Sequence, residues 1–245
     1  LFRSAARDRR QRPRRWRLRD GVARRPVRLR CVARAVGPSR RGRRRFRAAT
    51  IGSLALGAGI ISTISFVPTL VQVGLGYGLW PASLLIVAWS GTSVATAYLS
   101  RHVRHPMQGP VPVALSLIVV AVGQGSSYGL VEQSSPWRLV PSLTLAGVAT
   151  GLLNALLGRE AVASVEADRA AMGSGANNTA RYFGAAVGIT LFVVIATHVG
   201  PSVVAGWNVA VLVSASITLL GAVGVALAGR SDRARVPLPD NVSRP

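Results

Sequence analysis

Six long apolar stretches constrain this chain more than any other feature of its sequence. The hydrocarbon core of a bilayer is about 30 Å thick, so a helix needs roughly 20 mostly apolar residues to cross it. The stretches of that kind cover residues 49–73, 82–99, 111–131, 139–158, 176–198 and 203–228. Each is apolar around its whole circumference, whereas a surface helix of a soluble protein keeps one polar face. The sequence therefore predicts an all-α membrane protein with six transmembrane helices.

The charged residues divide the chain into three parts. Residues 1–47 contain 20 Arg and two Asp, while the remaining residues contain 10 Arg and six acidic residues. A segment with so much like charge and so little apolar periodicity does not bury enough surface to fold, so residues 1–47 are expected to be disordered. The predicted six-helix bundle follows over residues 48–230, and residues 231–245 form a short tail.

Three interpretations of the Arg-rich segment remain open. As a cytoplasmic tail it would bind anionic lipid, since each Arg near the surface contributes about 1 kcal/mol. Electrostatic binding of nucleic acid has less support, because no recognisable nucleic-acid-binding fold accompanies the charge. Out-of-frame translation of GC-rich DNA, joined to the true frame near residues 44–47, would explain together the missing start Met, the absence of Lys and the absence of further helices before residue 49.

The loops between the stretches predict the orientation of the bundle. Arginine in short loops favours the cytoplasmic side of a membrane. Four alternate segments are rich in Arg, namely 43–47, 101–105, 159–169 and 230–235, whereas the other three loops together contain only Arg138. Both termini are therefore predicted to be cytoplasmic, in a multi-pass protein of the cell membrane.

Aromatic residues near the predicted outer ends of the helices support the same orientation. Amphipathic rings favour the headgroup zone of a bilayer. The residues in these positions are Tyr77, Trp80, Tyr128, Trp137 and Trp207. They are predicted to form an aromatic belt.

Two of the predicted helices carry small and polar residues on one face. The sets are Gly147, Gly151, Asn154 and Gly158 in the stretch 139–158, and Asn177, Arg181, Gly184 and Gly188 in the stretch 176–198. Both are spaced by four, three and four residues, which places each set along a single side of its helix. The G-x-x-x-G pairs Gly147/Gly151 and Gly184/Gly188 allow neighbouring backbones to approach closely in lipid. These four glycines are predicted to pack helices together.

Arg181 is the charged residue that most needs an explanation. A charge near the centre of a transmembrane helix costs about 2.5–3.5 kcal/mol on insertion scales, so it usually faces a cavity or a partner. Alternatively, Arg181 extends to the cytoplasmic headgroups from a turn and a half inside the membrane. Together with Asn177, Asn154 and Gln72, it is a candidate for substrate binding or gating.

Three segments resemble a known family. MGSGANNTARYFGAAVG at 172–188 is similar to the penultimate helix of the fourteen-helix drug:proton antiporters of the major facilitator superfamily. FVPTLVQ at 66–72, followed by Trp80-Pro81-Ala82, and PWRLVP at 136–141 agree with that resemblance. The first of these segments is the most specific. The resemblance covers about residues 46–230, which would be the last six helices of such a transporter.

The resemblance implies half of a proton-coupled efflux transporter for hydrophobic or cationic small molecules. Its partners would be the substrate, protons, the lipid bilayer and a missing N-terminal half, because such transporters rock two six-helix halves about a midplane site. None of the six stretches contains Asp or Glu, so the proton-binding carboxylate is expected in the missing half. A membrane-embedded scaffold or partner subunit, and a metabolite transporter of the same superfamily, remain alternatives.

One loop departs from the family pattern. The superfamily commonly places an Asp between the second and third helices of each half, and Arg101 stands at that position here. A lock based on a carboxylate of this loop is therefore not expected.

Enzyme chemistry finds no support in the sequence. There is no nucleophile–base pair, no metal-ligand spacing and no phosphate-binding loop. Cys31 is the only cysteine, so no disulfide forms within the chain. Neither enzyme activity nor a cofactor or metal is predicted.

Overall fold

The computed structural model describes residues 40–102, 109–165 and 170–230, and these residues contain helices and connecting loops without any strand. Residues 1–39 and 231–245, which include Cys31 and most of the predicted Arg-rich segment and tail, lie outside the described residues. The principal helices are α1 (Arg40–Leu56), α2 (Ser62–Thr69), α3 (Leu79–Leu99), α4 (Pro110–Gly125), α5 (Leu139–Ala163), α6 (Ala170–His198) and α7 (Val203–Arg230). Short 3₁₀ turns, η3 (Ser100–His102) and η4 (Pro136–Arg138), lie beside α3 and α5.

Five helical segments in the described part of the chain are long and apolar enough to cross a membrane. They are Gly42–Gly74, Leu79–His102, Pro136–Ala163, Ala170–His198 and Val203–Gly229. The sixth predicted stretch, 111–131, forms the shorter helix α4, which has 16 residues and a length of about 24 Å. The all-α membrane fold is thus confirmed, whereas a full-length sixth span is not.

The predicted end of the stretch 111–131 is wrong because the helix stops at Gly125. Ser126 and Ser127 follow, and Gly129 adopts a left-handed conformation with φ of 83°, which prevents the helix from continuing. The Oδ1 atom of Asn208 in α7 accepts hydrogen bonds from the backbone N–H groups of Gly129 and Leu130, at 3.0 and 3.2 Å. Apolar composition alone did not reveal that these residues form a loop.

The first span is a helix interrupted by two π-helical turns. These are η1 (Gly57–Ile61) between α1 and α2, and η2 (Leu70–Gly74) after α2. Pro68 lies inside α2 and cannot donate a helical hydrogen bond, so the irregular turn η2 follows it. Helix α1 begins at Arg40, which makes residues 40–47 of the predicted disordered segment helical. Arg is a good helix former, and here it extends a long apolar helix.

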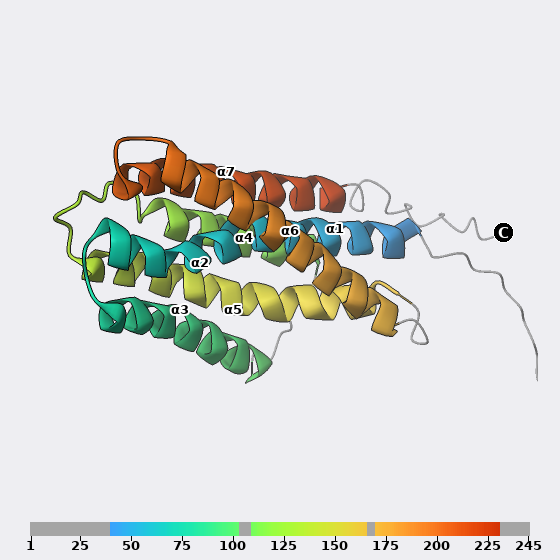
Figure 1. The fold of residues 1–245 in the computed structure, drawn as a ribbon. Coiled ribbons are helices and arrows are strands. Elements are labelled where there is room, and N and C mark those ends of the chain that lie inside the picture. The colour runs from blue at the N-terminus through green and yellow to red at the C-terminus, as the bar shows by residue number, and fades with distance from the viewer. Residues whose placement is uncertain (1–39, 103–108, 166–169, 231–245) are drawn as a thin grey trace, which may run out of the picture. The chain divides into compact units, whose positions relative to one another are not determined.

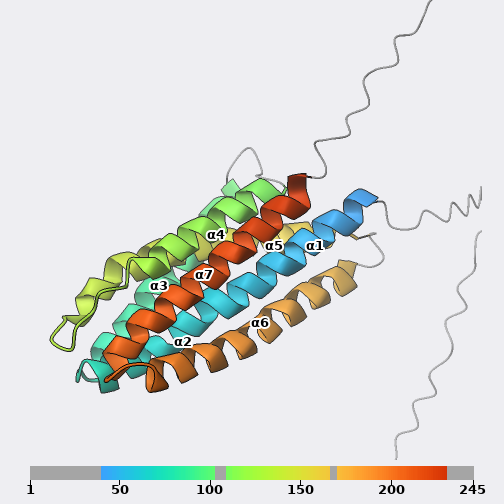
Figure 2. The same cartoon turned by 90° about the horizontal axis from the view of Figure 1, so that it is seen from above.

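The first span lies in the middle of the helical bundle. It contacts α5, α6 and α7, while α4 packs against α5 and α7, and α3 packs mainly against α5. Figures 1 and 2 show this arrangement, with α1 running between α6 and α7 in Figure 2. Because α3 has α5 as its main neighbour, most of its apolar surface is exposed.

Two apolar clusters hold the bundle together. One surrounds three aromatic rings, with centroid separations of 5.5 Å for Phe66 and Phe192 and 5.4 Å for Phe192 and Trp207. The other includes Leu117 and Leu153. Trp207, a residue of the predicted aromatic belt near the start of α7, packs against other helices and does not face outward. Its ring is fully buried, and its Nε1–H group donates to the carbonyl of Ser127 at 3.3 Å.

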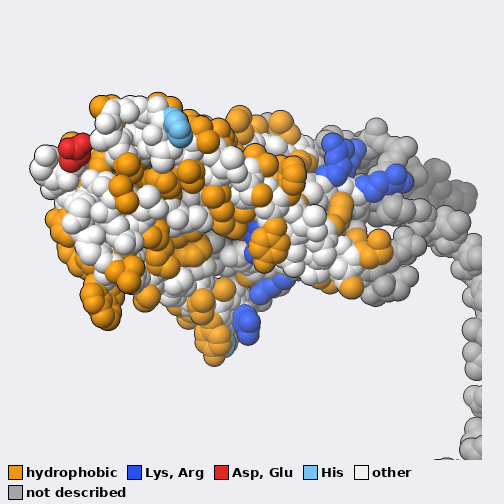
Figure 3. Space-filling view, in the orientation of Figure 1, with side chains coloured by type: hydrophobic (Ala, Val, Ile, Leu, Met, Phe, Trp, Pro, Cys, Tyr) orange, Lys and Arg blue, Asp and Glu red, His pale blue; other side chains and the backbone are white. Residues whose placement is uncertain are grey.

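Apolar side chains dominate the outer surface as well as the interior. Figure 3 shows them along the length of the helices, whereas Arg side chains are absent from the end of this view that lies opposite the start of α1. Large exposed apolar residues include Trp80 and Val94 on α3 and Phe183 on α6. In a soluble protein such a surface would aggregate. It suits a bundle that is surrounded by lipid or by further helices.

Candidate substrate site

Arg181 of α6 reaches across to α5 and joins two of the predicted candidates. Its Nη1 group donates to Oδ1 of Asn154 at 3.0 Å, and its Nη2 group donates to Oδ1 of Asn178 at 2.6 Å. Asn178 was not among the sequence candidates. It precedes Arg181 by three residues, a spacing that makes side chains neighbours on a helix, and this signal would have identified it.

The guanidinium group of Arg181 has only neutral partners. Among the residues that the structure describes, no carboxylate forms an ion pair with it, and its Nε–H group is buried without an acceptor. A buried donor without a partner costs about 1–3 kcal/mol. The amide oxygens of Asn154 and Asn178 orient the positive charge but do not neutralise it. The side chain is partly exposed, so an additional group can reach it.

Asn177 faces a different neighbour, although it lies one turn from Arg181. It is buried, and its Oδ1 atom accepts a hydrogen bond from the hydroxyl of Ser53 in α1. The same side of α6 carries Gly184 and Gly188, where an added Cβ would collide with the carbonyl oxygens of Leu54 and Ala58. The structure therefore places Asn177 in the contact between α1 and α6, and not beside the Arg181 guanidinium.

The glycines of α5 contact α3. A Cβ at Gly147 would collide with the Thr92 hydroxyl, and one at Gly151 would collide with the carbonyl oxygen of Ser93. Gly158, the last member of the predicted face, is exposed and has no neighbour within 4 Å of such a Cβ. The α5 face thus divides between a helix contact and Asn154, which turns toward α6.

Gln72 lies apart from the Arg181 group. It is exposed in η2, and its Nε2 group donates to the carbonyl of Pro68 at 3.3 Å. Gly57 abuts the backbone of Arg181. Gln72 comes 15 residues after Gly57, which corresponds to about 22 Å along a helix. The structure does not bring this candidate to the same site.

A buried polar cluster in the bundle was not predicted. The Nε2 group of Gln124 in α4 donates to the hydroxyls of Thr63 and Ser214, each at 2.9 Å, and its Oε1 atom accepts from Thr218 at 2.9 Å. The hydroxyl of Ser214 also donates to the carbonyl of Gly59 in η1 at 2.9 Å. These residues come from distant parts of the chain, so no local pattern could reveal them. Their hydrogen bonds join α4 and α7 to the irregular part of the first span.

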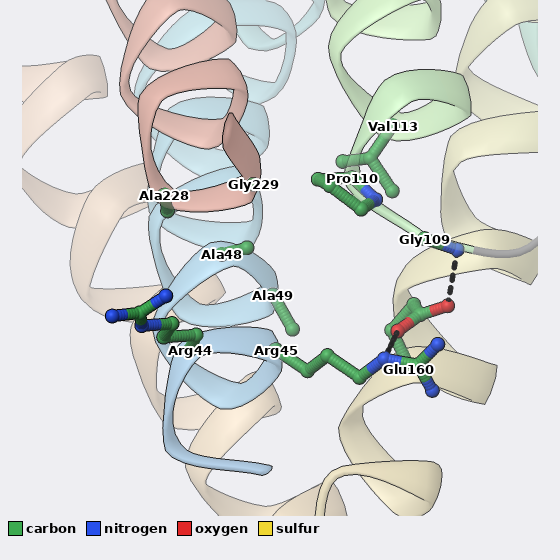
Figure 4. Close-up of a pocket in the computed structure, with 10 residues that line it drawn as sticks. All are labelled: Arg44, Arg45, Ala48, Ala49, Gly109, Pro110, Val113, Glu160, Ala228 and Gly229. Atoms are coloured by element: carbon green, nitrogen blue, oxygen red, sulfur yellow. Dashed lines mark hydrogen bonds and ion pairs between the residues drawn. The ribbon is translucent and has the colours of Figure 1, made fainter. Parts of the chain in front are cut away.

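A carboxylate occupies one end of the bundle, contrary to the prediction that the helices contain none. Helix α5 continues to Ala163 and therefore includes Glu160, two residues beyond the predicted stretch. Oε1 of Glu160 accepts from the backbone N–H of Gly109 at 2.7 Å, and Oε2 lies 4.0 Å from Nε of Arg45 (Figure 4). A negative charge at the N-terminus of α4 is favourable because the helix dipole is positive there. Although Arg101 replaces the loop Asp, α5 supplies a carboxylate at the end of that loop.

The cavity beside Glu160 is too small to hold a substrate. Arg44, Arg45 and Pro110 contribute to its walls, and its volume is about 50 Å³ (Figure 4). Drug-sized ligands occupy pockets of about 300–1,000 Å³. Glu160 thus joins α1, α4 and α5, while Arg181 is the better candidate for substrate contact.

Comparison with known proteins agrees with a transporter. The model of the family described as "Major Facilitator Superfamily" matches residues 3–189. A relative named "Probable actinorhodin transporter", from Streptomyces coelicolor, is 27% identical over 156 residues, which are 61% of this chain and 26% of the relative. The chain thus matches about a quarter of the length of this curated relative. The family match covers well over half of the chain, so this multi-pass membrane protein belongs to the major facilitator superfamily.

Proposed function

We propose that the chain is the C-terminal six-helix half of a transporter that exports hydrophobic small molecules in exchange for protons. The observation that carries this proposal is the hydrogen bond between Arg181 and Asn154, which places a charged group between α5 and α6 in a largely apolar bundle. Polar residues inside a membrane bundle mark substrate or ion pathways. The subtype, a fourteen-helix drug:proton antiporter, rests on the resemblance of residues 172–188.

A second half is part of the proposal. Alternating access in this superfamily needs two repeats that rock about a site between them. The chain carries one set of helices, and its match covers a quarter of the relative. Exposed polar residues such as Asn178, Ser65 and Gln72 would be costly against lipid, and a second half would cover them.

The proton-binding carboxylate is assigned to that second half. Glu160 is the acidic residue that the described helices contain, and its carboxylate already binds Gly109 and lies beside Arg45. A carboxylate that carries a proton in each transport cycle has to change its partners, whereas the contacts of Glu160 hold three helices together. Glu160 is therefore assigned a structural role.

An exporter of one particular metabolite is the second candidate. The relative is named for the transport of a single compound, actinorhodin, which favours a narrow substrate range over multidrug efflux. A scaffold or partner subunit has no comparable observation in its favour.

Reading the DNA upstream of the codon for Arg44 in all three frames tests the proposal. We expect further hydrophobic helices to be encoded there, and cells that express the complete protein should accumulate less of a hydrophobic fluorescent dye, with neutral and anionic dyes tested side by side. If no frame encodes further helices and the 245-residue chain alone expels the dye, the chain is not half of a transporter.

A further inference from the structure

We infer that the ligand bound at Arg181 is an amphipathic organic anion, a carboxylate or acidic phenol on an apolar body. This deepens the proposed function and rests on it, since it names the class of substrate for the same site. It replaces the cationic part of the expectation that came from the family resemblance.

The positive charge of Arg181 is unbalanced among the described residues. Arginine carries five N–H donors and a permanent positive charge. Two of these donors bind the amide oxygens of Asn154 and Asn178, and no described carboxylate pairs with the guanidinium group. A cation bound beside Arg181 would meet repulsion that no carboxylate of the described residues offsets. An anion would supply the missing negative charge.

The guanidinium group also has donors to spare. Its Nε–H group is buried beyond the reach of a ligand, but Nη1 and Nη2 each donate one of the hydrogen bonds to Asn154 and Asn178 and carry a second N–H that no described acceptor uses. Charge-assisted hydrogen bonds from a guanidinium fork to two oxygens are shorter and stronger than neutral ones. A carboxylate accepts from such a fork with two oxygens and a phenolate with one, whereas an ammonium group cannot accept a hydrogen bond.

Exposed aromatic side chains beside Arg181 could contact the apolar part of the ligand. Asn178 and Tyr182 are exposed and four residues apart, so they share one face of α6. Tyr182 is 71% exposed and Phe183 is 64% exposed. Because the Nη2 group of Arg181 reaches Asn178, an anion bound there would lie close to an unoccupied aromatic side chain. The site thus offers a charged contact and an apolar contact together.

Three probes with the same ring and different charges test the inference. The chain in nanodiscs of zwitterionic phosphatidylcholine would be titrated with 1-naphthoate, 1-naphthylmethylammonium and 1-naphthalenemethanol, and binding followed by saturation-transfer NMR. The titrations would be repeated with Arg181→Gln, which keeps hydrogen-bond donors but removes the charge. Arg138→Gln, in the turn before α5, is the matched control, because it removes one Arg far along the chain from α6.

We expect the naphthoate to bind about tenfold more tightly than the ammonium probe. Arg181→Gln should remove this preference, and Arg138→Gln should leave it unchanged. The control matters because the 20 Arg of residues 1–47 also attract anions. A preference that survives Arg181→Gln would come from that segment and would overturn the inference. Equal or tighter binding of the ammonium probe, or no binding of the naphthoate, would overturn it as well.

Failure of the anion site and failure of the transporter proposal give different experimental results. If the complete protein transports but binding of the anion does not depend on Arg181, the transporter proposal stands and the anion site falls. If Arg181-dependent binding is found but the complete protein moves no solute, the anion site stands and the transporter proposal falls. Loss of the preference in the complete protein would show that a carboxylate of the other half pairs with Arg181, which also overturns the inference.

Discussion

At the scale of single residues, Arg181 shows how a transmembrane helix carries a charge that has no counter-ion among the residues with a described structure. Its guanidinium group is held between α5 and α6 by two amide oxygens, which replace part of the water that it loses. The planar fork of Arg fits two acceptors at fixed angles, whereas Lys presents a compact point charge. A role limited to anchoring at the headgroups would not need this geometry.

Substitution of Arg181 should therefore stop transport without removing the protein. In the complete transporter, we expect Arg181→Lys and Arg181→Ala each to abolish efflux while the amount in the membrane stays normal. Efflux of the substrate and immunoblots of membrane fractions would measure the two effects, with Arg138→Lys as the control. Normal efflux by Arg181→Lys would instead assign this residue to the interface as an anchor.

The Gln124 cluster has a structural role that can be measured separately. Gln124→Leu removes the partner of Thr218 and takes a donor from Thr63 and Ser214. Buried polar groups left without partners cost about 1–3 kcal/mol. We expect the thermal unfolding temperature of the purified chain to fall. Gln72→Leu, at an exposed position, should leave it nearly unchanged. Equal effects of the two substitutions would mean that the cluster does not stabilise the bundle.

At the scale of helices, α1 and α6 are joined along a seam of small residues. Gly57, the first residue of η1, abuts the carbonyl of Arg181, while Gly184 and Gly188 on α6 abut the backbone of α1 and η1. Without a hydrophobic driving force between helices in lipid, such close backbone contact supplies the packing. The seam also holds Arg181 at its position, so packing and the candidate site depend on the same contact.

A large side chain in this seam should separate the two helices. We expect Gly184→Leu to reduce the amount of folded protein, because its side chain would collide with the carbonyl of Leu54. Gly175→Leu on the same helix is the matched control, since a Cβ there meets nothing within 4 Å. Size-exclusion profiles of the detergent-solubilised proteins would compare them. Similar monodisperse peaks for both variants would contradict the close packing.

The helices could be predicted from the sequence better than their ends. Length and composition identified the apolar segments, because the bilayer imposes both. They did not show that α4 stops at Gly125, since the backbone of Gly129 and Leu130 leaves the helix to bind Asn208, a residue of a helix distant in the sequence. Likewise, Glu160 was placed in a loop because charge was taken as the end of a helix, whereas its partners Gly109 and Arg45 allow it to stay inside α5.

Whether the short helix α4 crosses the membrane is a further test. In a Cys31→Ser background, we expect Gln133→Cys, which follows α4, to react with an impermeant maleimide added to intact cells. His102→Cys, which precedes α4, should react only after the cells are opened. Both side chains are exposed in the structure. Labelling of the two positions from the same side would show that α4 does not cross.

At the scale of the whole molecule, the described bundle has surfaces that suit two different neighbours. The apolar surface of α3 fits either lipid or another helix, whereas the exposed Asn178 and the partly exposed Arg181 on α6 fit a water-filled or protein-lined space. A site that uses one half of such a transporter is incomplete, because alternating access moves one half against the other. Family membership follows from the sequence match, and transport is predicted to need a second half.

Proton flux into liposomes that contain a pH-sensitive dye tests most directly whether transport needs a second half. Liposomes with the 245-residue chain alone should show no proton flux when substrate is added on one side. Liposomes with the complete protein, encoded together with the upstream helices, should show a flux that depends on substrate. Substrate-driven flux with the chain alone would contradict the claim and would indicate that copies of the six-helix unit transport by themselves.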